Sequence, residues 1–382
     1  MLCMILVSCT GQKTGKENDN NDKIAIEVGE IKFPPQDVLQ LKSYYLSSSV
    51  HVDSIDYLIG YNYRLHSLDC MNLKSKSVTQ IVLPGDGPDA IVRLSGIYAQ
   101  SLDSVWISDE SERAFLIDSV GTIKRMTLYR YATVNVLDLK KYLEDQEQLL
   151  INTNYAMFTS HLFYNASRHS LMFLVKHTPS NTFIVKEVFI DEVGKMATYQ
   201  LSSSKVVPDM SKGYAYINFP NVNFVGENIV YNYPVESSIY MLDIRTNERK
   251  YILADSHYTS NIIEKCTTSG DYATLEKHWL ENSHFYDIMY LPKYKIYARL
   301  HADKVDFDEK KGMEKLINER DLYLMLFDEN MEKIGETKLS NCRYSPFTSW
   351  NATYGGIALF VDNVLDEKNN TDDLTIDIIS LK

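Results

Sequence analysis

A short phrase recurs along this chain, in which an apolar strand-like run ends at an aspartate. Its clearest copy spans residues 114–123, where Ala-Phe-Leu-Ile precedes Asp118 and Gly121 follows. This pattern predicts a strand, a tight turn and the start of another strand. The copies end at Asp69, Asp118, Asp191, Asp243, Asp328 and Asp377, which are 49, 73, 52, 85 and 49 residues apart. A unit of about 50 residues, with longer intervals where segments are inserted, predicts six four-stranded blades.

The N-terminal strand expected at 24–33 supplies the piece that the last unit lacks. It ends in Ile31-Lys32-Phe33-Pro34, which is similar to Ile81-Val82-Leu83-Pro84 at the end of the first unit. We therefore expect this strand to complete the last blade, which closes the ring and leaves no unpaired edge. The predicted fold is all-β, a six-bladed β-propeller of four-stranded antiparallel blades, in a single domain over 23–382. In the second unit the fourth strand is expected at 122–128.

Three insertions interrupt the repeat, at 129–157, 255–283 and 302–320. The apolar spacing predicts helices at 136–150 and 272–280. Loops between blades, and loops between the second and third strands of a blade, leave a propeller on the same face. All three insertions should therefore lie on one face, where long loops on a rigid scaffold favour binding. The alternative is that they only cap exposed blade edges.

The composition argues against nucleic-acid binding and against a membrane-spanning helix. The 382 residues carry a formal net charge of −12 without a long Lys/Arg cluster, so nucleic-acid binding is not expected. No run approaches the roughly 20 apolar residues of a membrane-spanning helix.

The N-terminus suggests a lipid anchor instead. Residues 1–9 are an apolar run that ends Leu-Val-Ser-Cys, which resembles a bacterial lipobox with Cys9 as the lipidated residue. No basic segment precedes the run, a departure from an ordinary signal peptide. Residues 10–22 are polar and are expected to form a flexible tether. The remaining Cys70, Cys266 and Cys342 are expected to be free thiols, and a Cys266–Cys342 disulfide is the one pairing that we weigh against this.

The sequence lacks the common catalytic and cofactor motifs, and we expect no cofactor or metal. His161, His169 and His177 are eight residues apart around one predicted hairpin, which would allow a metal site. Without a cysteine or carboxylate at matching spacing, we interpret them as ordinary strand and turn residues.

Two Tyr-Asn-Tyr turns are the best candidate for a binding site. They end the second strands of units one and four, which are opposite each other in a six-bladed ring, so they are expected to face each other across the channel mouth. Tyrosine and asparagine together suit sugars and peptides; the alternative is that these tyrosines pack between blades. The predicted ligand-binding residues are Tyr61, Asn62, Tyr63, Arg64, Asp109, Arg113, Tyr231, Asn232, Tyr233 and Glu236.

The lipobox, the tether, the six units and the phrases at 61–69 and 86–89 together resemble the six-bladed propeller lipoproteins of Bacteroides-type bacteria. The function of that family is largely unknown. The resemblance implies the fold and a location in the bacterial cell envelope, and it carries over no catalytic residues.

The leading hypothesis is a lipid-anchored envelope protein that binds a glycan, a peptide or another envelope protein through its insertion-bearing face. One alternative is a glycan-active lyase or hydrolase, which would need paired carboxylates or a His/Tyr pair at the channel mouth. Another is a non-catalytic scaffold of an envelope complex. We favour a role without catalysis.

Overall fold

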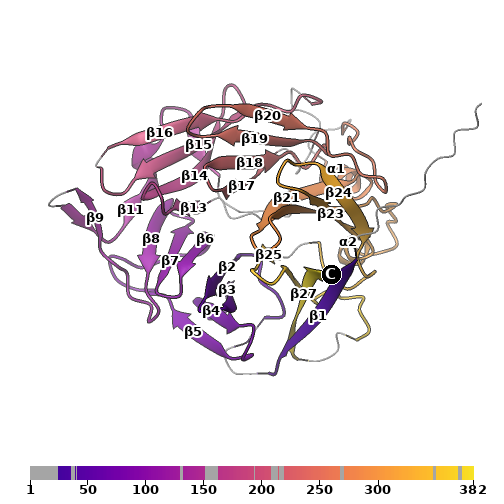
Figure 1. Ribbon diagram of the computed structural model, residues 1–382, viewed down its shortest axis with the longest axis horizontal. Coiled ribbons are helices and arrows are strands. Elements are labelled where there is room, and N and C mark those ends of the chain that lie inside the picture. The colour runs from indigo at the N-terminus through magenta and orange to yellow at the C-terminus, as the bar shows by residue number, and fades with distance from the viewer. Residues whose placement is uncertain are drawn as a thin grey trace, which may run out of the picture.

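The computed structural model describes residues 25–35, 39, 41–129, 132–150, 162–192, 194–207, 214, 219–266, 271–346, 350–368 and 372–382. Six antiparallel sheets of the described residues are arranged in a ring, which confirms the predicted six-bladed propeller (Figure 1). The predicted signal segment with Cys9, the tether and His161 lie outside the described residues.

The first three blades follow the order of the chain. Blade 1 contains β2 (Ser47–Val52), β3 (Ile55–Asn62), β4 (Ser67–Asn72) and β5 (Val78–Val82). Blade 2 contains β6 (Leu94–Ser101), β7 (Ser104–Asp109), β8 (Arg113–Ile117) and β11 (Leu137–Asp138). Blade 3 contains β13 (Leu162–Asn165), β14 (Ser170–His177), β15 (Thr182–Phe189) and β16 (Met196–Gln200), and β12 (Glu147–Leu149) pairs with the far end of β14.

The other three blades complete the ring. Blade 4 contains β17 (Asn221–Val225), β18 (Asn228–Asn232), β19 (Ile239–Asp243) and β20 (Arg249–Ile252). Blade 5 contains β21 (His284–Leu291), β22 (Ile296–Ala302), β23 (Leu322–Phe327) and β24 (Lys333–Lys338). Blade 6 contains β25 (Trp350–Ala352), β26 (Ile357–Phe360), β27 (Leu374–Leu381) and β1 (Ile26–Phe33).

The N-terminal strand closes the ring as predicted. β1 pairs with β27 along its whole length, from Ile26 opposite Leu381 to Phe33 opposite Leu374, and the two strands lie side by side in Figure 1. Arg343 strengthens this closure, because its guanidinium donates to Glu30 of β1 at 2.9 Å and to Asp377 of β27 at 2.9 Å.

The hydrophobic core is divided among the contacts between blades. The described residues contain six clusters of buried apolar side chains, and each joins two neighbouring blades. Phe33, for example, belongs to a cluster shared by blades 6 and 1. A blade therefore buries its faces only when both neighbours are present, which is the physical basis of the ring.

The second insertion was predicted more accurately than the first. α1 (Tyr272–Leu280) has the predicted bounds, and α2 (Met313–Asn318) lies within the charged third insertion. The helix predicted at 136–150 is wrong. The chain there forms β11, a 3₁₀ turn η1 (Leu139–Tyr142) and β12, because Leu137 and Leu139 are buried with the alternation of an extended chain and Asp138 caps the turn.

The predicted fourth strand of blade 2 is also wrong. β9 (Met126–Tyr129) and β10 (Ala132–Val134) instead pair with each other in a separate two-stranded sheet, of which β9 is seen at the outside of the ring in Figure 1. β11 takes the outer place instead by pairing with β8. No helix in the described part of the chain has the length and apolar character needed to cross a bilayer.

Removing the Phe33 ring tests the closure. Phe33→Ala should lower the free energy of unfolding by about 3–5 kcal/mol, because the ring is fully buried between the first and last blades. Urea-induced unfolding measures this change. The matched control is Val28→Ala on the exposed side of β1, which should cost about 1 kcal/mol or less. Equal effects of the two substitutions would contradict the closure model.

Candidate functional site

The ten predicted residues all lie where a second strand turns into a third, on the insertion-bearing face. In blade 1, Asn62 is buried and its amide donates to Asp69 at 2.8 Å, while its side-chain oxygen accepts from the backbone N–H groups of Arg64 and Leu65. Tyr61 is also buried. These two side chains fix the turn, which leaves Arg64 and Tyr63 exposed, the latter at 48%.

The corresponding turn of blade 4 is buried more completely. Tyr231 accepts from the backbone N–H of Ser202 at 2.9 Å, and Tyr233 donates to the carbonyl of the same residue at 2.7 Å. Tyr240 stacks on Tyr231 with ring centroids 5.1 Å apart. Glu236 accepts from the Tyr240 hydroxyl at 2.9 Å, and burial raises the pKa of its carboxyl. These contacts join blade 4 to the end of blade 3.

The remaining candidates also make contacts within the propeller. Arg113 forms an ion pair with the buried Asp109 at 2.5 Å and donates to the carbonyl of Ala90 at 2.7 Å. Asn232 donates to the carbonyl of Phe285 in blade 5 at 3.3 Å. None of the ten residues lines either of the two cavities described below. Their role in ligand binding stays a prediction.

A cleft of about 880 Å³ lies on the insertion-bearing face, and we call it the insertion cleft. It is bordered by residues 258–266 of the second insertion, by α1 with the residues after it, and by 303–306 of the third insertion. Its lining is polar and carries both signs of charge. The charged side chains are those of Glu264, Lys265, Lys277, Glu281, Asp303, Lys304 and Asp306.

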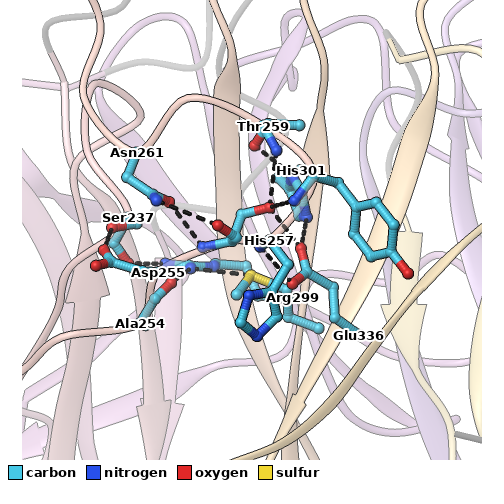
Figure 2. A network of polar contacts seen from close by, with 12 residues as sticks. Ser237, Ala254, Asp255, His257, Thr259, Asn261, Arg299, His301 and Glu336 are labelled. Carbon is cyan, nitrogen blue, oxygen red and sulfur yellow. Dashed lines mark hydrogen bonds and ion pairs between the residues drawn. The ribbon is translucent and has the colours of Figure 1, made fainter. Parts of the chain in front are cut away.

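Blade 5 holds one wall of this cleft in place through a buried polar network, shown in Figure 2. Arg299 of β22 is completely buried, and its guanidinium donates to the carbonyls of Ser237 at 2.6 Å and Ala254 at 2.9 Å. Burial lowers the pKa of Arg299 to about 9, so the group stays charged at neutral pH. The two carbonyls belong to blade 4 and its following segment, so Arg299 fixes the base of the second insertion.

Glu336 of β24 is the second centre of the network. Its carboxylate accepts from Ser256 Oγ at 2.6 Å, from the backbone N–H of His257 at 2.9 Å and from His301 Nε2 at 2.8 Å. Burial by itself would raise the pKa of Glu336, but the hydrogen bonds from these residues lower it to about 2. Thr259, which lines the cleft, contacts the other imidazole nitrogen of His301 at 3.1 Å.

A ladder of stacked rings runs from this buried centre to the cleft. Phe285 and His301 stack at 5.4 Å between ring centroids, His301 and Tyr323 at 5.1 Å, and Tyr323 and Tyr258 at 5.0 Å. Tyr258 lines the cleft and is 40% exposed. The ladder thus gives the cleft a flat aromatic surface whose orientation is set by the core, beside hydrogen-bonding and charged groups.

The sequence contains a signal for this network, although none of its members was among the predicted site residues. β22 is buried on both faces, yet Arg299 and His301 lie two residues apart within its apolar run and therefore point to the same side. A charged residue inside a strand of that kind must be paired. The described residues contain no group of three or more His, Cys, Asp or Glu side chains that could hold a metal ion. Cys70 and Cys342 are free thiols, so the Cys266–Cys342 disulfide does not form.

The geometry defines a class: a six-bladed propeller with one elaborated face and no recognised catalytic motif. Comparisons with known proteins place the chain in a family within this class. The profile of the family described as "Domain of unknown function (DUF4221)" matches residues 17–338, and the chain belongs to this family. No curated protein matches the chain.

Two solved structures from Bacteroides share the fold. A member of the same family from Bacteroides vulgatus is 14% identical and has a TM-score of 0.71, with 94% of this chain and 98% of that chain covered. A Bacteroides fragilis protein that is described as exported is 14% identical and has a TM-score of 0.57, with coverage of 95% and 97%.

The network predicts a pH-dependent contribution from Glu336. Because the folded pKa lies below the ordinary 4.5, the carboxylate stabilises the fold above pH 4.5, and this stabilisation is lost as the pH falls towards 2. Glu336→Gln should lower the free energy of unfolding at pH 7 by about 1.5–3 kcal/mol. The deficit relative to the wild type should shrink below pH 4.5.

Urea-induced unfolding between pH 3.5 and pH 7 measures both effects. The control is Glu332→Gln, which changes an exposed carboxylate in the turn just before β24 and should have little effect. Wild-type stability in Glu336→Gln at pH 7 would contradict the assignment.

Proposed function

We propose that this protein is a binding protein of the bacterial cell envelope that takes a polar ligand, a glycan or a peptide, in the insertion cleft. The observation that carries the proposal is the exposed Tyr258 ring, held in the cleft by the ladder to His301 and surrounded by polar groups. An aromatic face with nearby donors and acceptors is the usual composition of sugar and peptide sites. A fixed platform also reduces the ordering that binding would otherwise require.

The size and chemistry of the surface support ligand binding over a scaffold role. A more apolar groove between α1 and α2 also lies on the insertions, but at about 440 Å³ it is half the size of the insertion cleft. For the enzymatic alternative, Glu236 and Asp287 are buried carboxyls with raised pKa values, but neither lines the insertion cleft. A binding role without catalysis is therefore the better-supported proposal.

The envelope location is supported by two separate observations. The sequence carries the lipobox-like segment that ends at Cys9. The similar Bacteroides fragilis protein is described as exported. We propose that a lipid on Cys9 attaches the propeller to the membrane surface.

Binding in the cleft is tested by substituting its aromatic platform. A thermal-shift screen of the protein against glycans and peptides should give a ligand that raises the melting temperature. Tyr258→Ala should weaken the affinity for that ligand about tenfold, as measured by calorimetry, because loss of the stacking face and its buried area costs on the order of 1–2 kcal/mol.

The matched control is Tyr63→Ala, which removes a similarly exposed tyrosine from the same face outside the cleft. Unchanged affinity in Tyr63→Ala would locate the effect in the insertion cleft. A loss with Tyr63→Ala and not with Tyr258→Ala would instead favour the Tyr-Asn-Tyr turns. The absence of any ligand would overturn the proposal in favour of a scaffold.

Lipid attachment is tested independently. In a bacterial host, the wild-type chain should incorporate radiolabelled palmitate and sediment with membranes. Cys9→Ser should abolish the label and move the protein to the soluble fraction, because the thiol is the acceptor of the lipid. Cys3→Ser serves as the control and should change neither result. Labelling that persists in Cys9→Ser would exclude this anchor.

A further inference from the structure

A second cavity, of about 410 Å³, occupies the axis of the ring, and we call it the axial cavity. The innermost strand of every blade contributes to its lining: β2, β6, β13, β17, β21 and β25. The lining also reaches Gly226 and Pro292, which lie beyond the ends of β17 and β21 on the face opposite the insertions. The axial cavity is therefore distinct from the insertion cleft.

Asp287 of β21 is the one charged side chain among the described residues that line this cavity. A β-bulge places it there. Phe285 pairs with His301 and Ile288 with Arg299, so that Tyr286 and Asp287 together oppose one residue of β22. Bulges of this kind change the direction of a side chain and are frequent next to functional sites.

Among the described residues, the carboxyl of Asp287 has no cationic partner. Trp350 Nε1 donates to its Oδ1 at 3.0 Å, and no Lys, Arg or His of the described chain forms an ion pair with it. Burial raises the pKa of Asp287 to about 6, so the carboxyl is ionised at neutral pH. A buried carboxylate without a positive partner is unfavourable, and a cation in the cavity would offset that cost.

The rest of the lining consists of aromatic faces and neutral polar groups. Phe163 and Phe224 contact each other at 4.4 Å between ring centroids, and Tyr98 contacts Phe163 at 6.2 Å. Trp350 and Tyr290 also line the cavity. Aromatic rings with a single carboxylate are suited to organic ammonium groups, which they attract through the negative ring faces.

From this geometry we propose that the axial cavity binds a small organic cation, with its ammonium group at Asp287 and its apolar part against the aromatic rings. One carboxylate provides too few charged oxygen ligands for a dedicated divalent-metal site. A neutral ligand of the same shape would leave the carboxylate without a counter-charge. The axial cavity and the insertion cleft share no lining residue, so cation binding here stands if the proposed function fails.

Choline is a suitable probe, because 3,3-dimethylbutan-1-ol has nearly the same shape without the charge. Calorimetry with the wild-type protein at pH 7.5 should detect binding of choline and at least tenfold weaker binding of the neutral alcohol. At pH 5 choline should bind about tenfold more weakly than at pH 7.5, since protonation removes most of the carboxylate when its pKa is about 6. The other titratable side chains in the lining are Tyr98 and Tyr290, and burial raises the pKa of Tyr98 further above 10.0.

Asp287→Asn keeps the shape and the acceptor for Trp350, and it should reduce choline affinity at least tenfold. Asp303→Asn, which changes a carboxylate of the insertion cleft, should leave choline affinity unchanged. Equal binding of choline and the alcohol, no choline binding at millimolar concentration, or full affinity in Asp287→Asn would each overturn the proposal. If Asp287→Asn fails to fold, the comparison of the two probes and the pH profile decide the question with the wild-type protein alone.

Discussion

The structure depends on apolar burial between neighbouring blades. Each of the six core clusters joins two blades, so that no blade completes its own core. The ring must therefore close. The pairing of β1 with β27 closes it by joining the two ends of the described chain through hydrogen bonds. Arg343, which bridges Glu30 and Asp377, adds charge-assisted hydrogen bonds at that junction.

The same dependence explains why charged groups are found deep within blade 5. Arg299 makes directed hydrogen bonds from blade 5 to the carbonyls of Ser237 and Ala254 in and just after blade 4, and Glu336 accepts one from His257 of the second insertion. Apolar packing alone would leave the orientation of such a long loop poorly defined. The network gives the segment a fixed position on the ring, and Tyr258 a fixed position in the cleft. The buried network thus fixes the shape of the surface at the insertion cleft.

The fold could be predicted because its signals are local and repeated. The strand–Asp–turn phrase marks each blade, and the similarity of Ile31-Lys32-Phe33-Pro34 to Ile81-Val82-Leu83-Pro84 indicates the closing strand. The errors fall where the chain leaves the repeat, as at residues 136–150, where apolar spacing fits a helix but burial follows an extended chain. In the blades, the repeated phrase identifies strands whose individual β-propensity is weak. The insertions have no such repeat, so their structure was harder to predict.

The sites were less predictable, because they depend on contacts between distant residues. The turn at 61–64 has the composition of a binding site, but hydrogen bonds within the blade use Asn62. His301 and Glu336 are 35 residues apart, and no short motif connects them. The position of Asp287 in a cavity could not be predicted, because it depends on a bulge in β21 and on the inner strands of the five other blades.

The position of β1 also determines when the last blade can fold. Among the described strands β1 is synthesised first and its partner β27 last, and Ile26 pairs with Leu381. The final blade therefore cannot form until nearly the whole chain is available, and β1 must wait without its partner while the other blades assemble. Such long-range closure slows folding and leaves the edge of β1 open to wrong pairing in the meantime.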